Sequence, residues 1–400
     1  MHAILLREFE KINFLHFMEN GLEYKEEVLV DMRQVVILGG GKIGSLIATL
    51  LVESGDYAVS VGDVDSLVVS RLQKEIDNKH FQISSVDVQD KTALRSFLEQ
   101  AKPEAILSSL PYYCNPMVSE LALEIGSHYF DLTEDIEVTK KVRILSQGAA
   151  SAFVPQCGLA PGFISIVAHD LMTHFDSVEI VKMRVGALPV NPSNVLKYSL
   201  TWSTDGLINE YGNMCNGIEN GQEVTLLPLE GYETISIDGL LYEAFNTSGG
   251  LGTLADTFAE KVRTMNYKTL RYPGHCEKIH LLMNDLKLND DREILKRVLE
   301  KAVPKTLQDV VLIYTSVTGL RKGELFEENF VQKIYPRSIA GKLWSAIQVT
   351  TAAGICSVME LVLEQPERYR GFVTQETFDL SSILANRFGK VFAGEVSNSV

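Results

Sequence analysis

Three glycines, Gly39, Gly41 and Gly44, stand at a spacing that suits a phosphate-binding turn between a strand and a helix. Gly39 permits the tight turn, Gly41 lets a pyrophosphate approach the backbone, and Gly44 lets the helix lie close on the sheet. The expected helix begins at Lys42 and Ile43, where free N–H groups and the positive end of the helix dipole hold phosphates. We interpret this segment as a dinucleotide-binding fingerprint; the alternative is a plain glycine-rich turn.

An acidic residue follows at the distance that such a site requires. Asp63 ends the next apolar run, where a carboxylate accepts both hydroxyls of the adenosine ribose. An acid there repels the 2′-phosphate of NADP, and no arginine follows it until Arg71, so the sequence favours NAD. Ala48, one turn after Gly44, is small enough for close packing of the helix. The alternative for Asp63 is that it caps the next helix.

The fingerprint lies in a segment where apolar strands and helical patterns alternate. This alternation predicts an α/β fold, with a Rossmann domain of doubly wound parallel sheet over residues 32–160. Ligands bind at the carboxyl ends of such strands, so Asp87 is a candidate acceptor for the adenine amino group. The alternative is that Asp87 caps the helix at Lys91. After the strands that end at Leu38 and Asp63, the pattern predicts strands at 81–86, 105–110, 128–132 and 152–157, and helices at 66–77, 91–100, 115–125 and 134–151.

Beyond residue 160 the pattern changes to longer alternating runs with hairpin turns. We interpret residues 161–340 as a second, α+β domain with a mixed sheet, which binds the substrate and forms a homodimer through exposed strand edges. Residues 341–400 are expected to be helices that return to the first domain, because the stretch 344–359 has no charged residue and needs cover on all sides. That stretch is too short for a membrane span. The strands expected in the second domain are 178–185, 195–202, 233–237, 241–245, 310–318 and 325–334, with a hairpin turn at Asp238 and Gly239.

The composition limits the classes of partner. The 400-residue chain has 37 basic and 52 acidic residues, a formal charge of −15, which argues against nucleic acids and membranes as partners. Its five cysteines are scattered, and His169 and His174 are five residues apart, so we expect no disulfide framework, no metal site and a reducing cytoplasm. Residues 1–31 lack a signal-peptide pattern and are interpreted as an N-terminal extension, with apolar residues at helical spacing.

Several motifs, in order along both domains, are similar to those of one known family. In the first domain these are the fingerprint, 61–65 (Val-Gly-Asp-Val-Asp), 108–113 (Ser-Ser-Leu-Pro-Tyr-Tyr), 129–132 (Tyr-Phe-Asp-Leu) and 157–162 (Cys-Gly-Leu-Ala-Pro-Gly). In the second domain they are 198–203, 243–250 and 270–278. Together these motifs resemble the saccharopine dehydrogenase family, and those of the second domain resemble its lysine 6-dehydrogenase branch.

The resemblance implies NAD-dependent oxidation of the lysine side-chain amine to allysine, which cyclises to piperideine-6-carboxylate. It also implies that Ser109, Leu110 and Pro111 contact the cofactor. The lysine ammonium has a pKa of about 10.4, so the site must remove a proton before hydride transfer. His275, after a Pro-Gly turn, and Asp131, at a strand end, are our catalytic candidates. The alternatives are that His275 binds a backbone carbonyl and that Asp131 caps a helix.

The remaining candidates bind the amino-acid substrate. Arg271 offers a bidentate fork to the carboxylate, and the alternative is a surface ion pair. Thr247 and Ser248 form a polar loop over the substrate, or an ordinary turn. Tyr112, Tyr113 and Trp202 wall its aliphatic chain, or fill the core between the domains.

Two other functions are compatible with the sequence. The first is an L-glutamate-forming saccharopine dehydrogenase, which would need further cations; Lys182, Arg184, Lys197 and Lys268 are available in the chain. The second is a non-catalytic protein that senses NAD, which a second domain without inward-facing polar groups would favour. The motifs around Arg271 and His275 argue against the second.

Overall fold

The structure, a computed structural model, describes residues 32–394. The interpretation of residues 1–31 as a partly helical extension lies outside the described residues. The same holds for the last six residues of the expected C-terminal segment.

The first sheet contains seven parallel strands in the order β17-β6-β5-β4-β1-β2-β3. The fingerprint strand β1 lies in its interior, between β4 and β2, and alternate residues of β1 face opposite cores. Val35 and Ile37 belong to one hydrophobic cluster, and Val36 and Leu38 to another. Burial on both faces explains why these strands are continuous apolar runs. The strands are β1 (Arg33–Leu38), β2 (Tyr57–Asp63), β3 (Phe81–Ser85), β4 (Ala105–Ser108), β5 (His128–Asp131), β6 (Ala152–Val154) and β17 (Gly371–Phe372).

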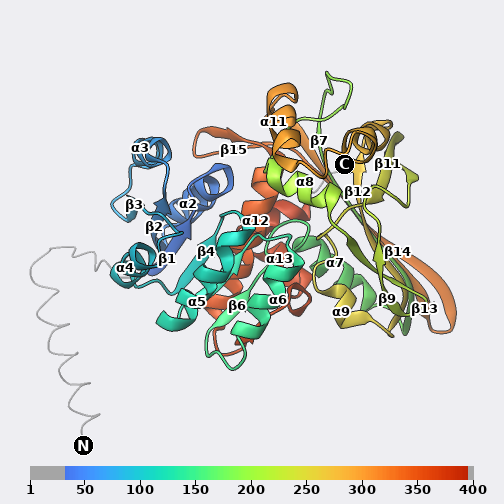
Figure 1. Cartoon of the computed structure of the whole chain (residues 1–400). Helices are drawn as coiled ribbons and strands as arrows, with labels where there is room; N and C mark the ends of the chain where they lie inside the picture. The colour runs from blue at the N-terminus through green and yellow to red at the C-terminus, as the bar shows by residue number, and fades with distance from the viewer. Residues whose placement is uncertain (1–31, 395–400) are drawn as a thin grey trace, which may run out of the picture. The chain divides into compact units, whose positions relative to one another are not determined.

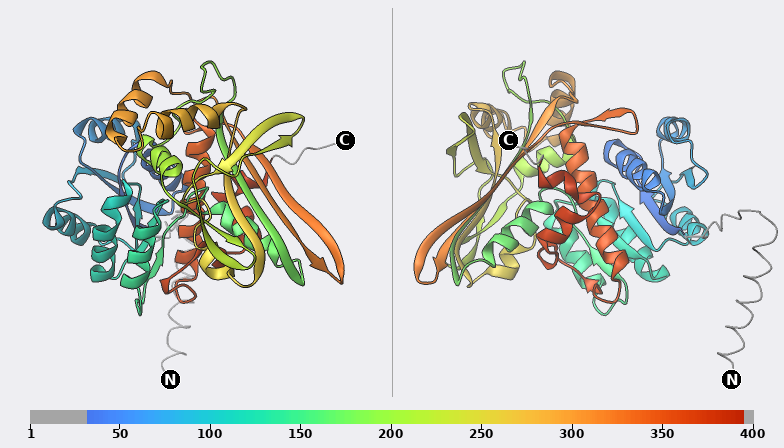
Figure 2. Two further views of the ribbon diagram at one scale, coloured as in Figure 1. Left: turned by 45° about the vertical axis from the view of Figure 1, so that its right-hand side comes forward. Right: turned by 180° about the vertical axis from the view of Figure 1, so that it is seen from behind.

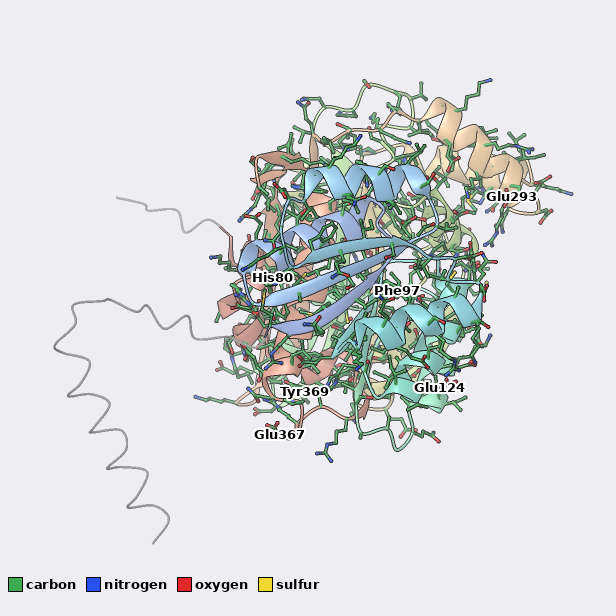
Figure 3. All side chains as sticks on the ribbon, turned by 90° about the vertical axis from the view of Figure 1, so that its left-hand side faces the viewer. His80, Phe97, Glu124, Glu293, Glu367 and Tyr369 are labelled. Atoms are coloured by element: carbon green, nitrogen blue, oxygen red, sulfur yellow. The ribbon has the colours of Figure 1, made fainter. Side chains whose placement is uncertain are left out.

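Helices cover both faces of this sheet, as Figure 1 shows. The predicted Rossmann-like fold is therefore confirmed. Figure 3 views the molecule from the side of β3; Phe97, labelled there on α4, packs against the sheet at Gly62. The short strand β17 has no periodic pattern, and the sequence did not predict it. The helices of this region are α2 (Lys42–Ser54), α3 (Ser66–Glu75), α4 (Lys91–Ala101), α5 (Asn115–Ile125) and α6 (Ile136–Leu145).

The second sheet is mixed, as expected. Its strands follow the order β10-β11-β12-β7-β13-β14; in addition β8 pairs with β12, and β9 pairs with β8. β12 pairs with β7 in parallel, and the other pairs are antiparallel. The turn at Asp238 and Gly239 has positive φ at both residues, which gives the strands of a hairpin their natural twist. The strands are β7 (Ser177–Pro189), β8 (Cys215–Glu219), β9 (Gln222–Leu226), β10 (Glu233–Ile237), β11 (Leu240–Asn246), β12 (Val262–Arg271), β13 (Asp309–Arg321) and β14 (Glu324–Ile334).

The strand expected at 195–202 is wrong, because this segment has an irregular backbone. Lys197 has a positive φ of 51°, and Leu200 N–H donates to the carbonyl of Pro304 at 2.9 Å, outside any sheet. Tyr198 and Leu200 are buried in a separate cluster with the helices around the cleft. The apolar alternation therefore reflects burial against helices. The other elements are α7 (Phe163–Met172), α8 (Thr204–Gly212), α9 (Leu254–Phe258), α10 (His275–His280), α11 (Arg292–Ala302), α12 (Ala346–Glu364), α13 (Leu380–Ala385), β15 (Arg337–Ile339) and β16 (Lys342–Trp344).

The uncharged stretch forms α12, which lies between the two sheets in Figure 2. It contacts α2, β4 and β5 on one side and β13 on the other. By length and composition α12 could cross a membrane, but 83% of its apolar window is buried inside the protein. The predicted buried helix is confirmed. α12 thus joins the two parts of the molecule that form the cleft.

Candidate active site

A cavity of about 510 Å³ lies between the fingerprint and the second sheet. Its walls come from the start of α2, the loops after β4, β5 and β6, β7, the irregular 200–203 segment, α8, the end of β12, the end of α11 with the segment after it, and the start of α12. Its lining includes Gly41, Lys42, Ile43, Ser109, Leu110, Pro111, Tyr112, Glu134, Trp202, Glu210, Arg271, Lys305, Ile347 and Thr351. This edge of the first sheet carries the carboxyl ends of its parallel strands, where ligands of such folds bind.

The geometry of the fingerprint fits a dinucleotide. A Cβ at Gly39, whose φ is +92°, would lie 2.6 Å from the carbonyl oxygen of Ser109, and one at Gly44 would lie 1.8 Å from that of Gly39. Neither position therefore tolerates a side chain. A Cβ at Gly41 would meet nothing within 4 Å, and no side chain caps α2 at this residue. The start of α2 thus has space beside Gly41 and no side-chain acceptor at its cap, as a bound pyrophosphate requires.

The acids proposed for the adenosine half do not cap helices. Asp65 caps α3 by accepting from Leu67 N–H, and Asp90 caps α4. Asp63, partly exposed, accepts from Gly40 N–H at 2.6 Å. Asp87 is exposed after β3 and accepts from Gln89 N–H at 2.9 Å. Since other residues supply both caps, the capping alternative is excluded for Asp63 and Asp87.

The expected cofactor contacts line the same cavity. Lys42 and Ile43 come from α2, and the run Ser109, Leu110 and Pro111 follows β4. The pKa of Lys42 is lowered by burial and then by the positive charge of Lys305, which also lines the cavity. Neither lysine has an ion pair within residues 32–394. Two cations without an acidic partner favour an anionic ligand beside the fingerprint.

Asp131 does not reach the cavity. Its side chain is fully buried and accepts from Tyr129 OH at 2.7 Å, Gln156 N–H at 2.9 Å and Thr133 N–H at 3.0 Å. Asp135, not Asp131, caps α6. The structure thus corrects both the catalytic role and the cap expected for Asp131, which instead joins the loops after β5 and β6.

His275 also lies behind the cavity wall. It is 1% exposed, its Nδ1 donates to the carbonyl of Leu196 at 2.8 Å, and its Nε2 then accepts from Tyr211 OH at 3.0 Å. Burial, and then the charge of Arg271, lowers the pKa of His275 to about 3. It is therefore neutral and does not reach a substrate. This corrects the expectation of a general base, and the carbonyl-binding alternative describes its contact with Leu196.

Arg271 lines the cavity at the end of β12. Its Nε donates to Tyr211 OH at 2.8 Å and its Nη1 to the carbonyl of Leu270 at 2.8 Å. The guanidinium lies over the rings of Tyr198 and Tyr211, with its carbon 5.0 and 5.7 Å from their centres. Its Nη2 lies 3.9 Å from Glu210 Oε2. This packing fixes the plane of Arg271, so its Nη2 edge is aimed at Glu210.

Two acids of the cavity, Glu210 and Glu134, were not among the site residues predicted from the sequence. Burial, opposed by Arg271 and reinforced by the charge of Glu134, raises the pKa of Glu210 to about 8. Burial also raises the pKa of Glu134. Glu210 stands three residues after Leu207 and next to Tyr211, on the buried side of α8. An acid at an apolar position of an amphipathic helix was the signal that would have found it.

Of the other residues expected to bind the substrate, three line the cavity and two lie outside it. Tyr112, Tyr113 and Trp202 line the cavity; Trp202 packs on Gly206, and its Nε1 donates to Tyr198 OH at 3.3 Å. Thr247 and Ser248 are buried outside it, and Ser248 Oγ donates to the carbonyl of Asn209 at 3.0 Å. The structure therefore corrects the expected polar loop over the substrate: Ser248 supports the end of α8, and the Thr247 hydroxyl is buried without a hydrogen-bond partner among the described residues.

The cations that saccharopine would need also lie elsewhere. Arg184 and Lys268 pair with Glu233, and Lys197 Nζ donates to the carbonyl of Pro273. These three, like Lys182, do not line the cavity. Within residues 32–394, no group of three or more His, Cys, Asp or Glu is placed to hold a metal ion.

Comparisons with known proteins agree with this arrangement. The family model described as the saccharopine dehydrogenase NADP binding domain matches residues 35–154, and that of the saccharopine dehydrogenase C-terminal domain matches residues 158–392. Among solved structures, apo saccharopine dehydrogenase (L-Glu forming) from Saccharomyces cerevisiae is similar, with a TM-score of 0.70 and 16% identity over 90% of this chain and 96% of that one. This likeness establishes the fold.

Two further solved structures are similar at lower scores. An engineered D-amino acid dehydrogenase bound to NADP+ has a TM-score of 0.46 and 11% identity, over 91% of this chain and 100% of that one. The DAP dehydrogenase of C. glutamicum in complex with DAP has a TM-score of 0.45 and 10% identity, over 92% and 100%.

Proposed function

Because the chain belongs to the saccharopine dehydrogenase family, and is an oxidoreductase with a nicotinamide cofactor, we propose that it oxidises the side-chain amine of lysine with NAD. The product is allysine, which cyclises to piperideine-6-carboxylate. The observation that carries this proposal is the pair of Glu210 and Arg271 in one buried wall of the cleft.

The charges of the cleft match a lysine-like substrate. Glu210 and Glu134 offer carboxylates to an ammonium, and the fixed fork of Arg271 offers a partner for one carboxylate. Tyr112 and Trp202 supply apolar surface for a methylene chain. Saccharopine carries additional carboxylates. Of the cations expected for them, Arg184 and Lys268 pair with Glu233, Lys197 donates to Pro273, and Lys182 does not line the cavity. The two lysines that do line it, Lys42 and Lys305, are assigned to the anionic cofactor beside the fingerprint. The charge count therefore favours lysine over saccharopine.

Glu210 is the proposed proton acceptor. A bound nicotinamide supplies the hydride acceptor, and the amine must first lose a proton so that its lone pair can stabilise the cation that forms at carbon. Roughly three pKa units, about 4 kcal/mol, separate neutral pH from a free lysine amine. A carboxyl whose pKa is near 8 is a stronger base than an ordinary glutamate. Water then adds to the iminium carbon, ammonia leaves, and the aldehyde remains.

The proposed cofactor preference rests on Asp63. A carboxylate that accepts the ribose hydroxyls disfavours a 2′-phosphate by charge repulsion. We expect kcat/KM to be higher with NAD than with NADP. Equal efficiency with both cofactors would contradict this role of Asp63.

The experiment is a substrate panel of lysine, ornithine, saccharopine and 1,5-diaminopentane with each cofactor, followed by absorbance of the reduced nicotinamide. We expect reduction with lysine, accompanied by release of ammonia. Reduction with saccharopine and release of glutamate would establish the alternative enzyme instead. Cofactor binding without turnover of any amine would favour the sensing alternative.

A further inference from the structure

The strand β12 presents alternate residues to the cavity. Tyr267, Thr269 and Arg271 all line it, because side chains two residues apart in a strand lie on one face of the sheet. On the neighbouring strand β7, Val185 and Ala187 continue the same surface. This face of the second sheet forms one wall of the cleft, and Arg271 is only one of its polar groups.

The hydroxyl of Tyr267 has no hydrogen-bond partner in the described part of the chain. On the same face, Thr269 Oγ1 donates to the carbonyl of Val185 at 3.3 Å, and Arg271 Nε donates to Tyr211 OH. Tyr267 is 6% exposed, and its oxygen is not among the atoms that are sealed inside the protein without a partner. A nearly buried hydroxyl without a partner is unfavourable. This group is therefore suited to a ligand that enters the cavity.

Two consecutive glycines hold the ring of Tyr267 beside the loop that carries Glu134. A Cβ at Gly250 would lie 2.2 Å from Cε1 of Tyr267, so the ring packs directly on this glycine. A Cβ at Gly249 would lie 2.6 Å from the carbonyl oxygen of Glu134, which also lines the cavity. Tyr267 and Glu134 thus pack on the same turn of chain, at one end of the cleft.

The position of Tyr267 along β12 identifies the ligand group that it meets. Four residues of extended strand separate Tyr267 from Arg271 by roughly 13 Å along the backbone, so the two side chains meet different parts of a ligand. Burial, and then the charge of Glu210, raise the pKa of Tyr267 against a smaller opposing effect of Arg271. The hydroxyl is therefore neutral, and it lies toward the acidic end of the cavity, where an ammonium fits.

We propose that the Tyr267 oxygen accepts a hydrogen bond from the terminal ammonium of the substrate, and so selects ligands with a primary amine at the end opposite the carboxylate. This inference deepens the proposed function and rests on it. A primary ammonium has three N–H donors, which Glu210, Glu134 and Tyr267 match in number. A secondary ammonium has two, and would leave one of these acceptors without a partner.

The test measures the affinity of the complex of the whole chain with NADH for lysine by nicotinamide fluorescence, which requires no turnover. Tyr267→Phe should weaken lysine binding roughly 5- to 30-fold, because one hydrogen bond to a charged group is lost. It should weaken 1,5-diaminopentane, which has the same terminal ammonium, by a similar factor. Binding of norleucine, which has a methyl group in place of that ammonium, should not change.

Tyr272→Phe is the matched control. The Tyr272 hydroxyl donates to the carbonyl of Pro189 at 3.0 Å, and the residue does not line the cavity. This variant should lower Tm and leave lysine binding unchanged. Tyr267→Phe removes an unpaired hydroxyl, so it should not lower Tm.

Three results with Tyr267→Phe would each overturn the inference: unchanged lysine binding, an equal loss for lysine and norleucine, or a lower Tm, which would indicate a structural partner for the hydroxyl. A parent chain that binds lysine without oxidising it would contradict the proposed function and leave this binding test intact. A parent chain that does not bind lysine would contradict both.

Discussion

Glu210 and Arg271 illustrate how a buried wall can combine a base with a cation at the scale of single residues. Desolvation favours the neutral form of the Glu210 carboxyl, and Arg271 at 3.9 Å favours its charged form. Desolvation dominates, so the group titrates near pH 8 instead of near its ordinary value. A residue in this state can accept a proton from an amine at mildly alkaline pH.

This state predicts the pH dependence of the reaction. Glu210 must be ionised to accept a proton, so kcat/KM for lysine should rise as pH increases through about 8. Glu210→Gln should lower kcat by roughly 10²- to 10⁴-fold, because a general base is lost. The rise near pH 8 should disappear from the remaining activity, as measured by steady-state assays from pH 6 to 10.

Thermal melting provides the control for this variant. When folding raises the pKa of a carboxyl, the folded protein loses stability as the pH rises from the unfolded pKa of that group to its folded pKa. Glutamine cannot ionise, so Glu210→Gln should melt no lower than the parent chain at pH 9. A lower Tm there, or an unchanged pH profile, would remove Glu210 from the mechanism.

Substitutions at Arg271 and at the residues behind it should have different effects on KM. Arg271→Ala removes a carboxylate contact made in the ground and transition states, so it should mainly raise KM for lysine, by about 1.5–3 kcal/mol. Tyr211→Phe removes the hydroxyl that accepts from Arg271 and donates to His275. Tyr211→Phe should raise KM for lysine less than Arg271→Ala does. It should not change KM for 1,5-diaminopentane, which has no carboxylate.

His275→Gln completes this comparison. The buried imidazole is neutral and acts through Tyr211, so the variant should resemble Tyr211→Phe in steady-state kinetics. A loss of kcat with both lysine and the diamine, at unchanged Tm, would instead restore His275 as a proton acceptor.

At the scale of elements, the position of α12 depends on a buried acid in the second sheet. Asp309, at the start of β13, accepts from Ala346 N–H at 2.6 Å and Ile347 N–H at 3.0 Å. Ser345 and Gln348 add a capping box, and Gln348 Nε2 reaches the carbonyl of Lys42. The N-terminal end of α12 is thus tied both to the second sheet and to the fingerprint helix.

Asp309→Ala should therefore destabilise the chain and disturb the cleft together. Loss of a cap costs about 0.5–2 kcal/mol, and buried N–H groups left unpaired add about 1–3 kcal/mol. Ile347 and Thr351 line the cavity, so KM for lysine should also rise. Asp291→Ala, which removes an exposed cap from α11, is the matched control for differential scanning calorimetry. Asp291→Ala should lower the free energy of unfolding less than Asp309→Ala does, and it should leave KM for lysine unchanged.

At the scale of the whole molecule, β9, β10 and β14 are edge strands of the second sheet. β14 lies at the outer margin of the structure in Figures 1 and 2. Its Leu325 is 68% exposed, and Phe326 and Val331 are also exposed. Unpaired strand edges with apolar side chains favour pairing with another chain.

We therefore expect a homodimer in solution with β14 at its interface. Light scattering coupled to size-exclusion chromatography should give twice the chain mass of 44.5 kDa. Leu325→Lys should shift the protein toward the monomer. Ile144→Lys, at an apolar position of α6 that is 69% exposed, should leave the dimer intact. A monomeric parent chain would exclude the proposed interface.

Local patterns in the sequence were sufficient for the fold class and for the cofactor loop. The periods of apolar residues distinguish strands from helices. Gly39 is required by its contact with the loop after β4, and Gly44 by its contact with Gly39, whereas Gly41 leaves open space at the start of α2. The irregular 195–202 segment was mistaken for a strand, because burial against helices produced the same alternation as a sheet.

Only the tertiary structure decided which titratable groups face the cleft. His275 and Asp131 have the residue types of a base, but their surroundings come from distant segments that saturate their hydrogen bonds and exclude solvent. Glu210 becomes basic because burial, and then the charge of Glu134, outweigh the opposing charge of Arg271, and these contacts come from other elements. Proton affinity depends on desolvation and on nearby charges. Both are set by packing between segments far apart in the chain, which no local pattern records.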